Sequence, residues 1–245
     1  MFVALCFWGI ARSLKYTINS IENNILNILK ENNIEYKIYF HTYTSNSKYN
    51  NPRANEYDCK LDNNEYKILQ SDYIEVEDQD KIKLELDVKK YRTHGDAWHS
   101  NFNTLDNFIL AMYSRKKLWK LIVNSKEYDK ITHYIFVRPD VKFLNKFNIK
   151  WLNIINENQI FIPNFHLFHF GFNDRMCICK KSIAEVYSNI FTYVYLYSLR
   201  KKVHSETLIR DILLLRHPEI EIIGINFYFN RIRANGFELS DNRIY

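Results

Sequence analysis

Apolar runs and amphipathic stretches alternate along the start of the chain. Residues Phe2–Trp8 are all apolar and Gly9 follows them, a pattern typical of a buried strand that ends in a turn. Apolar residues recur at helical spacing from Ile18 to Leu29, and residues 35–41 again resemble a strand. A strand, a helix and a second strand within about forty residues predict a βαβ unit, and therefore a parallel sheet.

The most informative stretch is residues 134–143, which read Tyr-Ile-Phe-Val-Arg-Pro-Asp-Val-Lys-Phe. Its apolar part suits a buried strand, because β-branched and aromatic side chains pack well on a pleated surface. Pro139 cannot donate a ladder hydrogen bond, so the strand should end there. We therefore expect Arg138 and Asp140 at the carboxyl end of a strand, where open α/β sheets bind ligands. This pair suits a phosphate, a metal ion or both.

The remaining pattern predicts further strands and helices. We expect strands at residues 73–76, 133–138, 159–163, 168–172, 176–179 and 220–229, and helices at residues 103–123, 181–199 and 205–215. Residues 80–91 fit a strand or a helix, and the polar residues from about 42 to 72 predict an excursion over the surface. The predicted fold class is α/β, a Rossmann-type mixed and mostly parallel sheet flanked by helices, in a single domain of residues 1–245.

Polar clusters follow four of the strand-like segments. They are Gly9 with Arg12, Arg138 with Asp140, Asn173 with Asp174 and Arg175, and Arg231 with Arg233. In a mostly parallel sheet several of these clusters should converge on one edge, where the planar forks of the arginines would fit phosphate oxygens. Asp140 suits a hard divalent cation. Taken singly, an arginine more often caps a helix or pairs with a surface carboxylate.

Two acids are candidates for a general base. Glu206 lies in the first turn of the predicted helix 205–215, where an acid either stabilises the helix dipole or, if it faces the cleft, accepts a proton from a substrate hydroxyl. Asp174 is the alternative base, or a binder of sugar hydroxyls. His166 and His169 are three residues apart and do not share a strand face, so we do not expect a metal pair. Four loop residues fit surface packing better than contact with an acceptor: His94, Asp96, Trp98 and His99.

Composition narrows the class of protein. Hydrophobic residues make up 47% and aromatic residues 16% of the 245 residues, values typical of a globular protein. The net charge of +6, from 34 basic and 28 acidic residues, allows an anionic ligand, but without a dense basic stripe we expect no nucleic-acid partner. The four cysteines lack the pairing of a zinc site and are expected to be reduced thiols. We find no membrane span and no signal peptide, and expect a cytoplasmic protein.

Six segments occur in an order that resembles glycosyltransferases of the GT-A type, with the closest likeness to small members from large DNA viruses, algae and bacteria. The segments are FVALCFWGIARSLKYT (2–17), the helix 103–123, FVRPDVKF (136–143), GFNDR (171–175), HSETL (204–208) and FNRIRANG (229–236). The resemblance spans nearly the whole chain, and the order of the motifs adds most of its weight. It implies a GT-A-like fold and a hexosyltransferase-like enzyme of glycan biosynthesis, which moves a sugar from a nucleotide-diphosphate sugar to a hydroxyl of a glycan or another acceptor.

The resemblance also implies roles for individual residues. In GT-A enzymes a D-x-D motif ends a central strand and holds Mn²⁺ or Mg²⁺ against the diphosphate, and Arg138-Pro139-Asp140 stands where that motif would be. The other implied roles are nucleotide contacts by Gly9 and Arg12, sugar or acceptor contacts by Asn173 and Asp174, diphosphate contacts by Arg231 or Arg233, and the base of inverting members for Glu206. Because Arg138 replaces the first acid, either Asp140 binds the metal together with diphosphate oxygens, or Arg138 supplies the charge and metal is weak or absent.

Two other functions are alternatives. Asp140-Val141-Lys142 is similar to the D-x-K element of metal-dependent nucleases, although such a site needs a further acid on an adjoining strand. A noncatalytic nucleotide- or glycan-binding domain is compatible with the replacement of an expected acid by Arg138. The sequence has no G-x-G-x-x-G, Walker A or G-x-S-x-G motif, so common dinucleotide, P-loop and α/β-hydrolase sites lack support.

Overall fold

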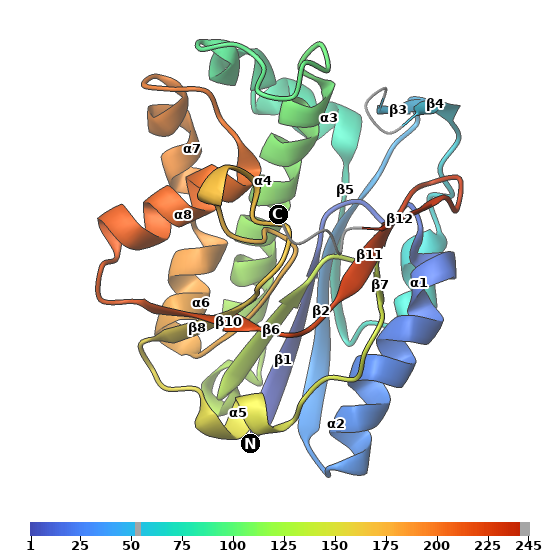
Figure 1. The fold of residues 1–245 in the computed structure, drawn as a ribbon. Coiled ribbons are helices and arrows are strands. Elements are labelled where there is room, and N and C mark those ends of the chain that lie inside the picture. The colour runs from blue at the N-terminus through green and yellow to red at the C-terminus, as the bar shows by residue number, and fades with distance from the viewer. Residues whose placement is uncertain (52–54, 241–245) are drawn as a thin grey trace.

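A seven-stranded sheet forms the centre of the computed structural model, which describes residues 1–51 and 55–240 (Figure 1). The strands are β1 (Phe2–Trp8), β2 (Glu35–Thr44), β5 (Tyr73–Asp78), β6 (His133–Val137), β8 (Gln159–Pro163), β9 (Met176–Cys179) and β10 (Glu221–Ile225). They lie in the order β10-β8-β9-β6-β1-β2-β5, and neighbours pair in parallel except β9, which is antiparallel to β6 and β8. The predicted mixed and mostly parallel sheet is therefore confirmed.

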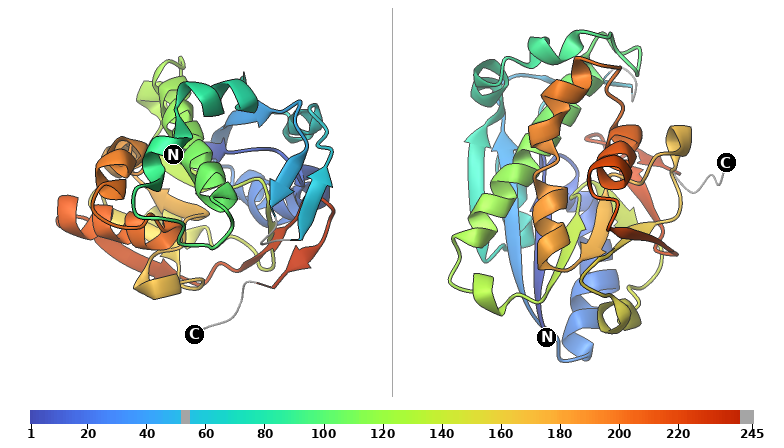
Figure 2. Two further views of the ribbon diagram at one scale, coloured as in Figure 1. Left: turned by 90° about the horizontal axis from the view of Figure 1, so that it is seen from above. Right: turned by 90° about the vertical axis from the view of Figure 1, so that its left-hand side faces the viewer.

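Helices cover both faces of this sheet (Figure 2). One face carries α1 (Leu14–Ile21), a π-helical turn (Glu22–Leu26) and α2 (Asn27–Glu31), and the other carries α4 (Asn103–Val123), α6 (Lys181–Ser188), α7 (Phe191–Ser198) and α8 (Ser205–Arg216). In β1, Cys6 and Trp8 belong to the core beneath α4, whereas Leu5 and Phe7 belong to the core beneath α1 and α2. Because successive residues of a strand face opposite sides, an all-apolar strand is buried completely only between two helical layers.

Shorter helices connect these layers. They are α3 (Gln79–Glu85), α5 (Lys150–Ile154) and 3-10 helices at Glu65–Leu69, Val88–Arg92, Tyr128–Lys130 and Phe168–Phe170. None of the helices in the described part of the chain combines the length and apolar character needed to cross a membrane.

Two smaller sheets lie beyond the central one. A hairpin joins β3 (Tyr49–Asn51) to β4 (Glu56–Cys59), and a three-stranded sheet has the order β12 (Glu238–Leu239), β11 (Phe229–Ile232) and β7 (Val141–Phe143). β7 begins directly after Asp140, and β11 pairs with it so that Arg231 lies opposite Val141. The N–H of Ile232 donates to the carbonyl oxygen of Asp140 over 2.9 Å. This pairing carries the C-terminal arginines to the end of β6.

Several predicted elements differ in the structure. The predicted strand 168–172 is wrong, because the segment forms a 3-10 turn and the N–H of Phe172 donates to the carbonyl oxygen of Glu206, at 3.0 Å, instead of to a neighbouring strand. The predicted helix 181–199 is broken into α6 and α7, and the predicted strand 220–229 into β10 and β11. Residues 80–91 form α3 and a 3-10 helix. The elements predicted at 103–123, 159–163 and 176–179 have the expected bounds.

Candidate active site

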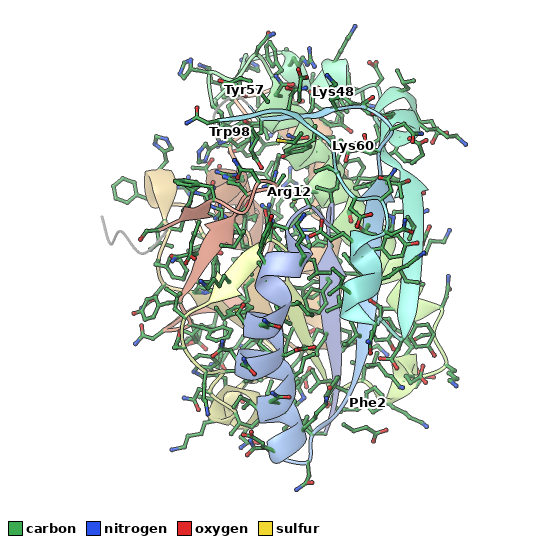
Figure 3. The ribbon with its side chains drawn as sticks, turned by 90° about the vertical axis from the view of Figure 1, so that its right-hand side faces the viewer. Phe2, Arg12, Lys48, Tyr57, Lys60 and Trp98 are labelled. Atoms are coloured by element: carbon green, nitrogen blue, oxygen red, sulfur yellow. The ribbon has the colours of Figure 1, made fainter. Side chains whose placement is uncertain are left out.

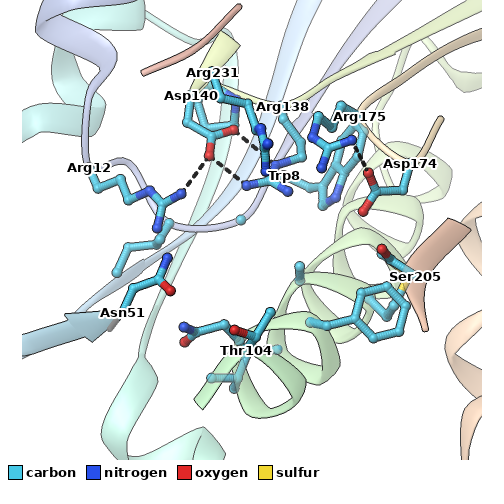
Figure 4. Close-up of a pocket in the computed structure, with 18 of the residues that line it drawn as sticks. Trp8, Arg12, Asn51, Thr104, Arg138, Asp140, Asp174, Arg175, Ser205 and Arg231 are labelled. Carbon is cyan, nitrogen blue, oxygen red and sulfur yellow. Dashed lines mark hydrogen bonds and ion pairs between the residues drawn. The ribbon is translucent and has the colours of Figure 1, made fainter. Parts of the chain in front are cut away.

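The carboxyl ends of β1 and β6 open into a cavity of about 330 Å³ (Figure 4). It is lined by eight of the predicted site residues: Gly9, Arg12, Arg138, Asp140, Asp174, Glu206, Arg231 and Arg233. β9 runs antiparallel to β6, so its N-terminal end reaches the same edge and brings residues 173–175 there. The structure thus places these eight residues around one cavity, and their roles stay predictions.

Asn173 is the predicted site residue that does not line the cavity. Its side-chain amide is buried, donates to the carbonyl oxygen of Phe165 at 3.1 Å and accepts from the N–H of Arg175 at 3.0 Å. Asn173 therefore holds the loop before β9 in shape.

Gly9 makes the turn between β1 and α1 with a φ of +92°. A side chain in this left-handed region costs about 1–2 kcal/mol, so glycine makes the turn without strain. Its N–H donates to Ser114 Oγ on α4 at 2.8 Å, and the same hydroxyl contacts the carbonyl oxygen and Nδ1 of His41. Apart from its two neighbours in the chain, no atom of the described residues lies within 4 Å of the position that a Cβ on Gly9 would take, so a ligand can approach the backbone here.

Asp140 lies between two guanidinium groups at the end of β6. Its Oδ1 accepts from Arg138 Nε at 2.9 Å, and its Oδ2 accepts from Arg138 Nη2 at 2.5 Å and from Arg12 Nη2 at 2.9 Å (Figure 4). Burial acts to raise the pKa of Asp140, but the charges of Arg138 and Arg12 hold that pKa well below its usual range. The carboxylate is therefore ionised, and it orients both arginines.

The polar excursion contributes side chains that the sequence pattern missed. The β3–β4 hairpin places Tyr49 and Asn51 in the cavity wall and buries Glu56 beside them. Arg12 donates to the hydroxyl of Tyr49, and its Nη1 lies 3.7 Å from Glu56 Oε2. In Figure 3 the hairpin lies above Arg12, at the end of the sheet opposite to Phe2. No local signal marks Tyr49, because its partner is 37 positions away in the chain.

Arg231 and Arg233 reach the cavity from β11 and the residues that follow it. Arg233 is 7% exposed, and its Nη1 lies 3.9 Å from Glu56 Oε2. Burial, together with the charges of Arg12 and Arg231, lowers the pKa of Arg233 to about 10. The guanidinium of Arg233 keeps its charge at neutral pH, but the neighbouring charges of Arg12 and Arg231 repel it. An anion bound in the cavity would offset this repulsion.

Glu206 begins α8, and its carboxylate is buried among donors. The hydroxyl of Ser205 donates to it, and Nδ1 of His166 and Nδ1 of His204 each lie 3.3 Å from one of its oxygens. Arg175 Nη1 lies 3.6 Å away. Burial acts to raise the pKa of Glu206, but His166 and Arg175 hold that pKa far below its usual range. So weakly basic a carboxylate accepts protons poorly at neutral pH.

Asp174 faces the cavity from the loop before β9. Its Oδ1 pairs with Nη1 of Arg175 at 2.8 Å. In Figure 4 the other carboxylate oxygen of Asp174 points into the cavity. Arg175 thus fixes the orientation of the carboxylate and leaves one of its oxygens directed into the cavity, the geometry that the predicted base needs.

Trp98 provides an aromatic wall that the sequence had assigned to surface packing. Its ring stacks on His204 with centroids 5.3 Å apart, and both residues line the cavity. The carboxylate of Asp96 supports this loop by accepting backbone N–H bonds from Trp98 at 2.9 Å and from Phe102 at 3.0 Å. His94, Asp96 and His99 do not line the cavity.

A group of possible metal ligands lies outside the cavity. Ligand atoms of His41, Glu75 and Glu77, on β2 and β5, lie within 4.8 Å of one another. Lys117 Nζ already contacts both glutamates, at 2.7 Å from Glu75 Oε1 and 3.1 Å from Glu77 Oε1. The ammonium group therefore supplies the cation at this cluster.

Fold and cavity together define an α/β protein with an arginine-rich cavity at the carboxyl edge of a mostly parallel sheet. No protein-family model and no curated protein matches the chain. Among solved structures, the chain is similar to the apo form of mouse xyloside xylosyltransferase 1, with a TM-score of 0.44 and 12% sequence identity, covering 91% of this chain and 84% of that chain. A likeness of this strength assigns no activity, so function has to be inferred from the chemistry of the cavity.

Proposed function

We propose that this protein is a glycosyltransferase that moves a sugar from a nucleotide-diphosphate sugar to an acceptor hydroxyl. The supporting observation is the cavity, which combines several guanidinium groups with the inward-pointing carboxylate of Asp174. The arginines that line it are Arg12, Arg138, Arg175, Arg231 and Arg233. Guanidinium forks bind phosphate oxygens bidentately, and a carboxylate near them suits removal of a proton from a hydroxyl. The order of the GT-A-like sequence motifs favours the same chemistry.

The donor diphosphate would bind between the Gly9 turn and the arginines. The open space over Gly9 admits a phosphate close to the backbone. Arg138 is 24% exposed, so its guanidinium can meet a ligand while Asp140 holds it in place. Trp98, on the loop before α4, offers an aromatic surface for the sugar or the acceptor.

The proposed reaction is a displacement at the anomeric carbon of the donor sugar. The acceptor oxygen forms a bond to that carbon while the bond from the carbon to the diphosphate oxygen breaks. The bonding electrons leave with the diphosphate, and Arg138 and Arg12 stabilise its added charge. The proton of the acceptor hydroxyl passes to Asp174, while Glu206 holds Arg175 and His166 in position.

The test is to incubate the purified protein with UDP- and GDP-sugars, with and without Mn²⁺, and to follow its melting temperature and the release of nucleotide. We expect one donor class to raise the melting temperature and to be slowly hydrolysed. Asp174→Asn should keep the thermal shift and lower turnover roughly 10²-fold or more, as loss of a general base does. Asp129→Asn is the matched control, because the side chain of Asp129 is 96% exposed and lies outside the cavity. A broad donor panel that gives neither a thermal shift nor hydrolysis would count against the proposal.

The nuclease alternative gains no support from the cavity. Lys142 Nζ pairs with Glu238 Oε2 at 2.8 Å, and neither residue lines the cavity. Within residues 1–51 and 55–240, the group of three possible metal ligands does not include Asp140. Turnover distinguishes a glycosyltransferase from a noncatalytic binding domain, because such a domain would bind a donor without transferring its sugar to any acceptor.

A further inference from the structure

Asp140, the acid to which the sequence assigned a metal ion, does not offer a fitting donor set. Both of its oxygens accept hydrogen bonds from guanidinium groups of Arg138 and Arg12. A divalent cation binds a carboxylate oxygen at about 2.0–2.6 Å, so it would lie beside both guanidiniums and be repelled by them. Asp140 is also only 2% exposed, which leaves little room for the water ligands that Mg²⁺ usually keeps.

The other acids of the cavity are also paired with arginine. Asp174 Oδ1 lies 2.8 Å from Arg175 Nη1, and Glu206 Oε1 lies 3.6 Å from the same nitrogen. Three acids and five arginines line the cavity in the described part of the chain, and the buried Glu56 beside Arg12 and Arg233 is a fourth acid. The guanidinium charges still exceed the carboxylate charges by one. Such an excess attracts an anion and disfavours a cation.

A further buried cation, Arg115, adds to this potential from behind the cavity wall. Arg115 is fully buried in α4, its guanidinium lies 3.8 Å from the ring centroid of Tyr187, and its Nη2 contacts the sulfur of Met112 at 3.2 Å. Its Nε and Nη1 have no hydrogen-bond partner among the described residues. The guanidinium also lies over Trp8, and Trp8 and Met112 both line the cavity. Charges in a low-dielectric interior are poorly screened, so Arg115 raises the positive potential inside the cavity.

We propose that the cavity binds the diphosphate of its donor without a divalent cation, with the arginines in the role of the metal and Asp140 as a positioning residue for Arg12 and Arg138. This inference rests on the proposed function. One carboxylate orients both guanidiniums, because it accepts from Nε and Nη2 of Arg138 and from Nη2 of Arg12. Nη1 of Arg138 and the second hydrogen of each Nη2 group then remain to donate to phosphate oxygens. The leaving diphosphate is stabilised by these fixed charges, which need no reorganisation as the bond breaks.

The experiment measures binding of inorganic pyrophosphate, UDP and GDP to the purified 245-residue protein by calorimetry, in EDTA and then in Mn²⁺ or Mg²⁺. We expect binding in EDTA, with an affinity that added Mn²⁺ changes by less than about tenfold, or 1.4 kcal/mol. Arg12→Lys and Arg138→Lys should each weaken binding by about tenfold or more, because lysine keeps the charge but loses the fork. Arg216→Lys, at an exposed position outside the cavity, is the matched control and should bind as the parent does.

Variants of Asp140 separate a positioning role from metal ligation. Asp140→Asn keeps one acceptor oxygen for Arg138, whereas Asp140→Ala leaves both arginines without it. We expect pyrophosphate to bind Asp140→Asn more tightly than Asp140→Ala, with both affinities insensitive to EDTA. Melting curves show whether each variant is folded, and the ranking is read from folded protein only.

The possible outcomes distinguish this inference from the proposed function. Binding that appears only with Mn²⁺ or Mg²⁺, and disappears in Asp140→Asn, would overturn the metal-free inference and leave the glycosyltransferase proposal standing. Failure of pyrophosphate, nucleotides and nucleotide sugars to bind under any condition would overturn both. Binding in EDTA that the Arg12 and Arg138 variants leave unchanged would also overturn the inference, because the anion would then lie elsewhere.

Discussion

Gly171 is the position where the cavity should be most sensitive to one added methyl group. A Cβ built on Gly171 would lie 2.3 Å from the carbonyl carbon and 2.5 Å from the carbonyl oxygen of Glu206. Carbon atoms in contact prefer about 3.5–4.0 Å, so Gly171→Ala must separate the loop from α8 by more than about 1 Å. Both partners are backbone, and no flexible side chain can absorb the shift. The hydrogen bond from the N–H of Phe172 to the carbonyl oxygen of Glu206, at 3.0 Å, should break with it.

The cost of Gly171→Ala follows from these two effects. Overpacking costs about 1–3 kcal/mol and the lost hydrogen bond about 1 kcal/mol, so we expect a loss of roughly 2–4 kcal/mol in the free energy of unfolding. For a chain of this size the melting temperature should fall by roughly 4–16 °C. Thermal and urea unfolding measure the loss. Binding of a donor or of pyrophosphate should weaken as well, because Glu206 holds Arg175 and His166 beside the cavity.

Gly224→Ala is the matched control for this substitution. Gly224 is exposed on β10, and a Cβ there would lie 3.1 Å from the Cβ of Asn164 and 4.0 Å from its Cα, so the neighbouring segment has to give by only a few tenths of an ångström. We expect this variant to unfold within about 0.5 kcal/mol of the parent, as surface substitutions usually do. If Gly171→Ala and Gly224→Ala melt at the same temperature and bind ligand equally well, the loop does not press against α8 as described.

Two further substitutions test the supports of the cavity. Glu206→Gln should make the free energy of unfolding depend less steeply on pH in acid. The folded-state pKa of Glu206 is depressed, so the carboxylate stabilises the folded chain above its unfolded pKa of about 4.3. Below that pH the parent loses this stabilisation by roughly 1.4 kcal/mol per pH unit, whereas the variant has no carboxylate to protonate at this position. Urea unfolding of both proteins from about pH 6 to pH 3 checks the slope, and parallel curves would contradict the depressed pKa. Ser114→Ala should cost about 1–3 kcal/mol, because it leaves the N–H of Gly9 and Nδ1 of His41 without their shared partner. Ser182→Ala, at an exposed hydroxyl, should cost less than about 0.5 kcal/mol, and an equal loss in the two serine variants would refute the anchoring role.

Strands and helices could be predicted where their pattern is local. The helix 103–123 and the strands 159–163 and 176–179 have apolar spacing that a single element satisfies, and the structure agrees at both ends. The segment 168–172 looked like a strand because it is rich in phenylalanine, but Gly171 lets its backbone press against α8, and Phe170 is 89% exposed. Aromatic content alone therefore did not distinguish a packed loop from a strand.

The cavity could be predicted only in the part that follows from topology. Parallel strands end on one edge, so Gly9, Arg138 and Asp140 were expected to meet, and the structure places them around one cavity. The hairpin side chains Tyr49 and Glu56 were missed because they lie in a polar segment that resembles a solvated surface loop. Glu56 is fully buried, and two cations that are distant in the sequence, Arg12 and Arg233, lie beside it in the folded chain. A buried acid whose partners are distant in sequence leaves no local pattern.

The residue at position 138 decides which sign of charge the end of β6 attracts. Two carboxylates in a D-x-D arrangement would carry a charge of about −2 and invite a divalent cation. With Arg138 in place of the first acid, the motif is neutral, and the contact of Arg12 with Asp140 makes the cluster of these three side chains positive by one charge. Under the metal-free proposal, this strand end attracts an anion directly, and Asp140 orients two guanidiniums instead of binding a metal ion. The residue at position 138 thus sets the charge of the motif itself, and Arg12, Arg175, Arg231 and Arg233 add to the positive charge around it.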